Sequence, residues 1–231
     1  MLPRLPYKLV IFDFDGTIAD TMPFLTKLAV DLLTEHYPVE PAAARKRYLE
    51  TVGVDFRSQL EELFPGHPEN DAVAAAFEAD KRAGILDCPV FSDVVQILEL
   101  LDRQGVTRFV CSSTTRELVV SYLRRHALEA GFEDCLGYEP GLAKTKQVKL
   151  ILARHELDPR EVVFVGDAPR DHELLRGTGV RFVGIHRLFD AGEFRRRGIP
   201  SVNDLAGLTR SWNRFERLDR RTEPPPDLRP R

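Results

Sequence analysis

The stretch that decides the fold reads Lys8-Leu-Val-Ile-Phe-Asp13-Phe-Asp15-Gly16-Thr17. The four residues before Asp13, from Leu9 to Phe12, are all apolar. A continuous apolar run of this length is typical of a strand that is buried on both faces of a parallel sheet. Alternation along an extended segment puts the carboxylates of Asp13 and Asp15 on the same side. Gly16 then permits a tight turn and a close approach of a ligand to the backbone. The stretch therefore predicts a buried strand that delivers two acidic groups to one edge of a sheet.

Similar apolar runs recur along the chain. Three strong runs lie at residues 107–113, 161–167 and 180–185, and a weaker strand is predicted near residues 135–138. Amphipathic helical patterns separate them at residues 94–101, 118–123 and 148–157. Strands that alternate with helices predict an α/β fold, a doubly wound parallel sheet.

Residues 18–88 break this alternation. They contain helical stripes, such as the one formed by Phe24, Leu25, Leu28 and Leu32, and no convincing strand. We expect an all-helical cap at 18–88, inserted into an α/β core made of residues 1–17 and 89–221. The last helix of that core should carry Leu205, Leu208, Trp212, Phe215 and Leu218 on its buried face. Residues 222–231, rich in proline and charge, are predicted to be a disordered tail.

Polar residues follow each strong strand at its carboxyl end, the edge where ligands bind in open α/β sheets. Ser112 and Ser113 end the second strand, and Thr114-x-x-Glu117 after them matches a capping box. Asp167 ends the third strand, with Asp171 four residues on, and Lys144 begins the helix before that strand. Asp20 is interpreted as a helix N-cap or a hinge of the cap.

Carboxylates that gather on one edge of the sheet repel one another unless a hard cation binds between them. Oxygen ligands from aspartates and a backbone carbonyl suit Mg²⁺, which keeps several waters and takes phosphate as a further ligand. A lysine and a serine can balance the remaining phosphate oxygens. Lys144 and Lys146 both lie at the helix start, and the residues alone leave either of them open for this role.

These residues form a set that resembles the haloacid dehalogenase (HAD) superfamily over roughly residues 8 to 208. Its four motifs appear in order: Asp13-Phe-Asp-Gly-Thr-Ile-Ala-Asp20, Phe109-Val-Cys-Ser112, Lys144-Thr-Lys-Gln-Val, and Gly166-Asp-Ala-Pro-Arg-Asp171. The placement of the insertion is similar to the helical cap of the first type, as in phosphoglycolate phosphatases. The first motif is highly specific, and the second and third are weak alone.

The resemblance implies a Mg²⁺-dependent phosphatase that acts on a small phosphorylated metabolite. Asp13 would attack phosphorus to form an aspartyl-phosphate, and Asp15 would act as general acid and base. Ser112 and Lys144 complete the catalytic set. The implied phosphate-binding residues are Gly16, Thr17, Ser112, Ser113 and Lys144. The implied metal ligands are Asp13, Asp15, Asp167 and Asp171.

Two other functions remain open on the same residues. A phosphomutase of the β-phosphoglucomutase type uses the same two aspartates and a helical cap, and a HAD-like binding module without activity would be expected to lack one of the catalytic groups. Asp15 argues against dehalogenases, which usually lack an acid at that position.

Composition excludes several classes of protein. The net charge is −3, so the overall charge gives no indication of nucleic-acid binding. No stretch approaches the ~20 apolar residues of a membrane span. Cys88, Cys111 and Cys135 lie in apolar surroundings and predict buried thiols in a reducing cytoplasm. We expect a cytoplasmic monomer or homodimer whose partner is the phosphorylated metabolite. Arg57, His67, His186 and Arg187 are weaker candidates for substrate contacts.

Overall fold

The computed structural model of the chain describes residues 7–210. Its sheet has six strands, and every pair of neighbours is parallel, in the order β3-β2-β1-β4-β5-β6. The strands are β1 (Leu9–Phe12), β2 (Thr107–Cys111), β3 (Asp134–Leu136), β4 (Val162–Gly166), β5 (Arg181–Ile185) and β6 (Ser201–Val202). The predicted α/β class and parallel sheet are confirmed, and the two-residue β6 is the strand that the sequence did not predict.

Helices cover both faces of the sheet. They are α5 (Val94–Arg103), α6 (Arg116–Arg125), α7 (Lys144–His155), α8 (Pro169–Leu174), α9 (Ala191–Arg196) and α10 (Ala206–Arg210), with short 3₁₀ turns η1 (Ile85–Asp87), η2 (Glu129–Gly131) and η3 (Pro159–Glu161). On β1, Val10 and Phe12 pack into the apolar cluster that holds the buried residues of α5, α6 and α10. Leu9 and Ile11 point the other way, into the cluster with α7 and α9. The strand is apolar at every position because both of its faces are buried.

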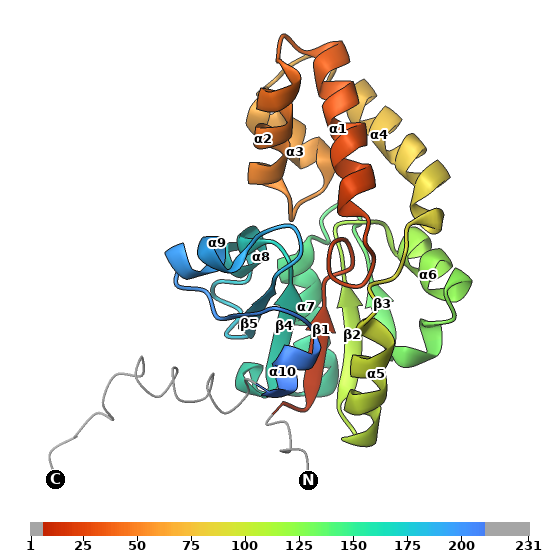
Figure 1. Cartoon of the computed structure of the whole chain (residues 1–231), viewed down its shortest axis with the longest axis vertical. Helices are drawn as coiled ribbons and strands as arrows, with labels where there is room; N and C mark the ends of the chain where they lie inside the picture. The colour runs from red at the N-terminus through yellow and green to blue at the C-terminus, as the bar shows by residue number, and fades with distance from the viewer. Residues whose placement is uncertain (1–6, 211–231) are drawn as a thin grey trace, which may run out of the picture.

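A four-helix insertion follows β1. It comprises α1 (Met22–His36), α2 (Pro41–Thr51), α3 (Phe56–Leu63) and α4 (Asn70–Gly84), which we call the cap, residues 22–84. Figure 1 shows these helices above one edge of the sheet, and a separate apolar cluster holds them together. The N–H of Asp20 donates to the carbonyl of Pro89 at 2.9 Å, so the chain enters and leaves the cap through two adjacent segments.

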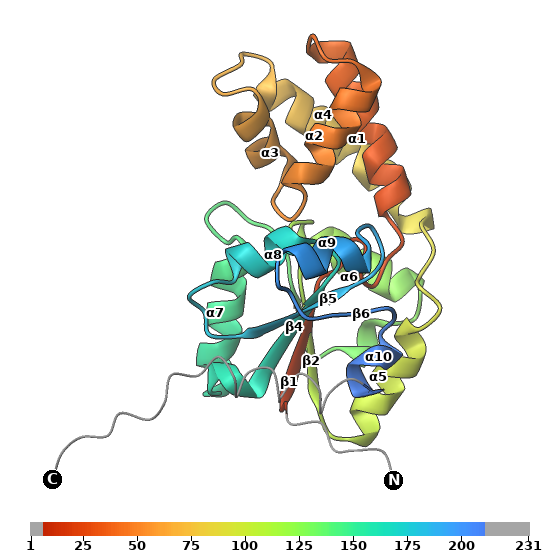
Figure 2. The same cartoon turned by 60° about the vertical axis from the view of Figure 1, so that its left-hand side comes forward.

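One cap loop reaches down to the core. In Figure 2 the segment between α2 and α3 descends towards the top of the sheet. Ser113 Oγ, in the loop after β2, donates to the carbonyl of Gly53 at 2.8 Å. Gly53 has a φ of +112°, a conformation that glycine adopts readily. The loop therefore holds the cap against the loop that follows β2.

Two helix-capping predictions were wrong, whereas the alternative role of Asp20 as a hinge of the cap stays a prediction. The N-cap of α1 is Thr21 rather than Asp20, and its side chain makes no capping bond. The N-cap of α6 is Thr115, also without a side-chain bond, so the expected capping box of Thr114 and Glu117 does not form. The Thr114 hydroxyl instead bonds a residue of the site described below.

Other expectations concern the ends and the interior. Leu205 and Leu208 are buried as predicted, whereas Trp212, Phe215, Leu218 and the predicted tail at 222–231 lie outside the described residues. The three cysteines are free and buried, as expected. Within residues 7–210, no helix combines the length and the apolarity needed to cross a bilayer.

Candidate active site

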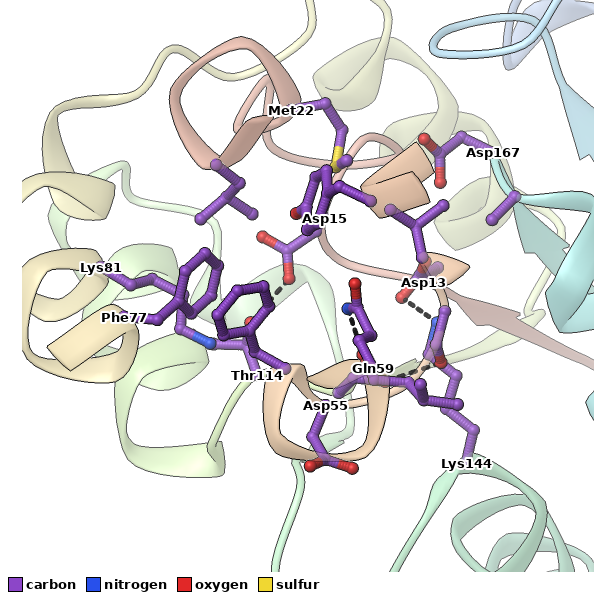
Figure 3. Close-up of a pocket in the computed structure, with 18 residues that line it drawn as sticks. Asp13, Asp15, Met22, Asp55, Gln59, Phe77, Lys81, Thr114, Lys144 and Asp167 are labelled. Carbon is purple, nitrogen blue, oxygen red and sulfur yellow. Dashed lines mark hydrogen bonds and ion pairs between the residues drawn. The ribbon is translucent and has the colours of Figure 1, made fainter. Parts of the chain in front are cut away.

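A cavity of about 50 Å³ lies between the carboxyl edge of the sheet and the cap. The core contributes residues that follow β1, β2 and β4 together with the first residue of α7, and α1–α4 contribute the opposite wall. Figure 3 shows Asp13, Asp15 and Asp167 on one side of this space and Lys81, Phe77, Gln59 and Asp55 of the cap around it. The motifs that are far apart in the sequence thus meet at one place.

Lys144 is the centre of a buried charge cluster. Its ammonium lies 2.9 Å from Asp13 Oδ1 and 2.8 Å from Asp171 Oδ1, and all three side chains are at most 6% exposed. Asp13 Oδ1 also accepts the N–H of Phe14 at 2.8 Å. Lys146 is exposed. Of the two lysines at this helix start, Lys144 is therefore the one that can neutralise a ligand beside Asp13.

The electrostatics of this cluster leave the acids short of positive charge. Burial raises the pKa of Asp13 well above its usual range, and although Lys144 lowers it, Asp171 and Asp167 raise it further. Burial raises the pKa of Asp167 to about 8, and Asp171 adds to the rise. Burial opposes the charge on Lys144, but Asp13 and Asp171 outweigh it and raise the pKa of the ammonium. One lysine thus faces three carboxyl groups, and a further cation would stabilise the ionised acids.

A divalent cation fits this donor set. Asp167 Oδ2 and Asp171 Oδ2 are buried and have no hydrogen-bond partner. A Cβ on Gly16 would lie 2.0 Å from Asp167 Oδ2, so the turn after β1 approaches this carboxylate closely. Among residues 7–210, no three His, Cys, Asp or Glu side chains surround a common point. Mg²⁺ needs few protein ligands, because it completes its shell with water and phosphate.

Asp15 is held by two threonines. Its Oδ1 accepts the hydroxyl of Thr21 at 2.8 Å, and its Oδ2 accepts the hydroxyl of Thr114 at 2.6 Å. Neither threonine was predicted as a site residue. Thr21 is the N-cap of the first cap helix and Thr114 follows the serine pair after β2, so the carboxylate is oriented from the cap side and from the core side together.

The predicted phosphate-binding residues lie at different depths. Ser113 and Lys144 line the cavity, whereas Gly16, Thr17 and Ser112 do not. Ser112 is fully buried, and its Oγ accepts the N–H of Thr114 at 2.9 Å. Thr17 is fully buried, and its hydroxyl has no partner. Their roles towards phosphate stay predictions.

The cap supplies residues that the sequence did not indicate. Lys81 and Gln59 line the cavity and are each 4% exposed. Gln59 Nε2 donates to the carbonyl of Val54 and its Oε1 accepts the hydroxyl of Thr51, both at 3.0 Å, which holds the loop that contacts Ser113. A lysine or a glutamine in an amphipathic helix usually faces water, so only the helix packing distinguishes these two from surface residues.

The weaker candidates lie elsewhere. Arg57 pairs with Glu61 at the surface of the cap, and His67 contacts the ring of Tyr37. His186 Nε2 lies 2.9 Å from Ser201 Oγ. Arg187 binds both carboxylate oxygens of Asp93, at 2.6 and 2.7 Å. None of the four lines the cavity.

The chain is similar to known proteins over most of its length. The chain matches the family model described as haloacid dehalogenase-like hydrolase over residues 10–185. A phosphoglycolate phosphatase of Synechococcus elongatus is 25% identical over 180 residues, which cover 76% of this chain and 82% of that protein. A 5′-nucleotidase of Pseudomonas aeruginosa is 26% identical over 223 residues, which cover 88% and 95%.

The fold is also found among solved structures. A predicted phosphatase from Clostridium acetobutylicum superposes with a TM-score of 0.75 at 20% identity, covering 91% of this chain and 99% of that one. At this identity the likeness supports the fold alone, and the family match carries the assignment. With a six-stranded parallel sheet, a helical insertion after β1 and a match over most of its length, the chain belongs to the haloacid dehalogenase-like hydrolase family.

Proposed function

We propose that this chain is a Mg²⁺-dependent phosphatase that hydrolyses a small phosphorylated metabolite through an aspartyl-phosphate on Asp13. The observation that carries the proposal is the 2.9 Å contact between Asp13 and Lys144 at the wall of the cavity between the core and the cap. A carboxylate beside a buried cation suits attack on a dianionic phosphate, because the ammonium offsets the charge that the two anions bring together. The named relatives in this family are phosphatases, which supports the same class of enzyme.

Asp13 is the nucleophile in this proposal. Its contacts within the described residues engage Oδ1, so Oδ2 is the oxygen open to attack. Bond formation from Oδ2 to phosphorus displaces the ester oxygen, which leaves with a proton from Asp15. Water then attacks the phosphorus, Asp15 takes a proton from it, and inorganic phosphate and free Asp13 are released.

Asp15 serves both proton transfers. The two threonine hydroxyls hold its carboxyl group at the cavity wall, which supports a role that demands fixed geometry. The same group that protonates the leaving oxygen is then positioned to receive the proton of the incoming water.

The metal would be held by Asp13, Asp167 and the backbone carbonyl of Asp15, with Asp171 close by. When bound, Mg²⁺ supplies positive charge to the phosphoryl oxygens. Asp171 holds Lys144 at 2.8 Å, so it orients the ammonium that neutralises the phosphate in addition to supporting the metal.

Phosphate release from a panel of phosphorylated metabolites tests the proposal. The panel includes nucleoside monophosphates, because one relative is named a 5′-nucleotidase. We expect hydrolysis with Mg²⁺, loss of it with EDTA, and loss of it in Asp13→Asn with the fold retained. Asp31→Asn, on an exposed face of the cap, is the matched control and should keep full activity. Substantial activity in Asp13→Asn would refute the nucleophile, and transfer of phosphate to a second sugar hydroxyl instead of water would favour the phosphomutase.

A further inference from the structure

Lys81 is a buried cation on the cap side of the cavity. It lies in α4, its side chain is 5% exposed, and it lines the cavity together with Asp13 and Asp15. Figure 3 shows its side chain reaching from the cap helix into the space beside Phe77. The ammonium lies 5.5 Å from the centre of the Phe77 ring. The transfer residues described above do not include it.

The ammonium of Lys81 has spare donor capacity. Within residues 7–210 its one hydrogen bond goes to Glu78 Oε1, at 2.8 Å, on the same helix. Glu78 is 40% exposed and does not line the cavity. Burial of an ammonium is costly unless acceptors surround it, and Lys81 has three N–H donors. An acceptor from a ligand would fill the remaining positions.

The position of Lys81 determines which part of a ligand it can reach. The phosphoryl group must lie at Asp13 and Lys144, on the floor formed by the sheet edge. Lys81 belongs to the opposite wall, so it faces the group attached to the ester oxygen. The neighbouring wall is largely apolar: Met22, Leu25, Tyr48, Val52, Phe56 and Phe77. A buried cation in such surroundings discriminates strongly between a charged and a neutral leaving group.

The size of the cavity limits the distance between the phosphoryl group and an anion that binds Lys81. A volume of about 50 Å³ corresponds to roughly three to five waters. The ammonium of Lys81 shares this small space with the phosphoryl group that would bind beside Asp13. The stem that joins it to a second charged group must therefore be short.

We propose that Lys81 is a specificity-determining residue that binds an anionic group, a carboxylate or a second phosphoryl group, at the end of a short leaving group. The proposal rests on the phosphatase function proposed above. It assigns to the cap a preference for small acidic phosphate esters over nucleotides and neutral esters.

A pair of substrates of equal size tests the proposal: 2-phosphoglycolate and its neutral amide, phosphoglycolamide. We expect the wild-type chain to have a kcat/KM about 10- to 100-fold higher for the acid, the size typical of a hydrogen bond to a charged group. In Lys81→Met the two substrates should become equal to within about threefold, through a higher KM for the acid. Lys81→Arg should restore part of the preference. Inorganic pyrophosphate tests the alternative in which the bound anion is a second phosphoryl group. Of 2-phosphoglycolate and pyrophosphate, the substrate that is hydrolysed faster and depends on Lys81 identifies the anion.

The controls separate this inference from the phosphatase itself. Hydrolysis of 4-nitrophenyl phosphate should change little in Lys81→Met, and Lys27→Met, which removes an exposed cap lysine, should keep the preference. Glu78→Gln removes the competing carboxylate from a half-exposed site and should raise the preference, so the test stands even if Lys81→Met does not fold. Equal losses on all substrates in Lys81→Met, or no acid preference in an active wild-type chain, would overturn the role of Lys81. Absence of any Asp13-dependent hydrolysis would overturn the phosphatase instead.

Discussion

The hydroxyl of Thr114 lies 2.6 Å from Asp15 Oδ2, although the two residues are 99 positions apart. The contact joins the loop after β2 to the loop after β1, and Thr21 holds the other oxygen of the same carboxyl group. The proposed acid and base is therefore oriented from both sides of the entrance to the cap.

Replacement of Thr114 by valine tests this orientation. A general acid and base contributes typically ~10²–10⁴ in rate, and we expect loss of one orienting bond to remove about tenfold of it. The loss should appear in kcat for an alkyl phosphate, with little change in KM, and should be smaller for 4-nitrophenyl phosphate, whose leaving group needs little protonation. Thr115→Val is the matched control, since that buried hydroxyl has no partner. Equal effects of both variants would contradict the role of Thr114.

The turn at Gly16 predicts a second outcome. Gly16 has a φ of +72°, and a Cβ there would lie 2.0 Å from Asp167 Oδ2. Gly16→Ala should lower the free energy of unfolding by about 1–2 kcal/mol for the left-handed backbone alone. Displacement of Asp167 should also reduce Mg²⁺-dependent activity by at least about tenfold, as for other residues that orient a metal ligand. Denaturant unfolding and Mg²⁺ titration of activity measure the two effects.

Gly177→Ala serves as the control for that variant. Gly177 has a φ of +82°, but no atom lies within 4 Å of a Cβ built there. The Gly177→Ala variant should therefore lose a similar amount of stability and keep its activity. If both variants lost activity to the same extent, the approach of Gly16 to Asp167 would have no special role.

The residues whose position the sequence predicts best are those whose signal is local. Asp13 and Asp167 each end an apolar run, Asp15 follows two residues after Asp13, and a parallel sheet brings the ends of such runs to one edge whatever the loops do. Thr114 and Lys81 were missed for a different reason. Thr114 matched a local capping pattern, and only the fold of two distant loops turns its hydroxyl towards Asp15. Lys81 lies in an amphipathic helix, where burial depends on how four cap helices pack.

The three cysteines should be inert in the folded chain. Burial raises the pKa of Cys88 to about 11 and that of Cys135 to about 12, and raises that of Cys111 well above its usual range. At pH 8 about one Cys88 in a thousand would be a thiolate, the reactive form. We expect no rapid reaction of the native chain with 5,5′-dithiobis(2-nitrobenzoic acid), and reaction of three thiols after unfolding. Fast labelling of one native thiol would contradict the buried positions.

An ion pair joins the cap to the core beside the site. Arg170 of α8 donates to both oxygens of Glu62 in α3, at 3.0 and 2.5 Å, and the two residues are 108 positions apart. Arg170 directly precedes Asp171, so the pair connects the cap to the helix that carries a predicted metal ligand. Hydrogen bonding to Arg170 lowers the pKa of Glu62, so the ion pair favours the ionised carboxylate.

Loss of this ion pair should weaken the contact between the cap and the core beside the site. The two side chains are 27% and 48% exposed, and such pairs contribute about 0–1 kcal/mol, which corresponds to at most about a fivefold change in an equilibrium. The cap supplies one wall of the cavity that would hold the substrate. Glu62→Gln should therefore raise KM by up to about fivefold without lowering kcat, and should weaken the dependence of KM on salt. Steady-state kinetics from low to high ionic strength measure both effects. Glu173→Gln removes a carboxylate that pairs with Arg197 within the core, so it should leave KM and its salt dependence unchanged. If Glu62→Gln behaved like that control, the cap would be held by the loop at Gly53 and by apolar packing, and the ion pair would have no part in covering the substrate.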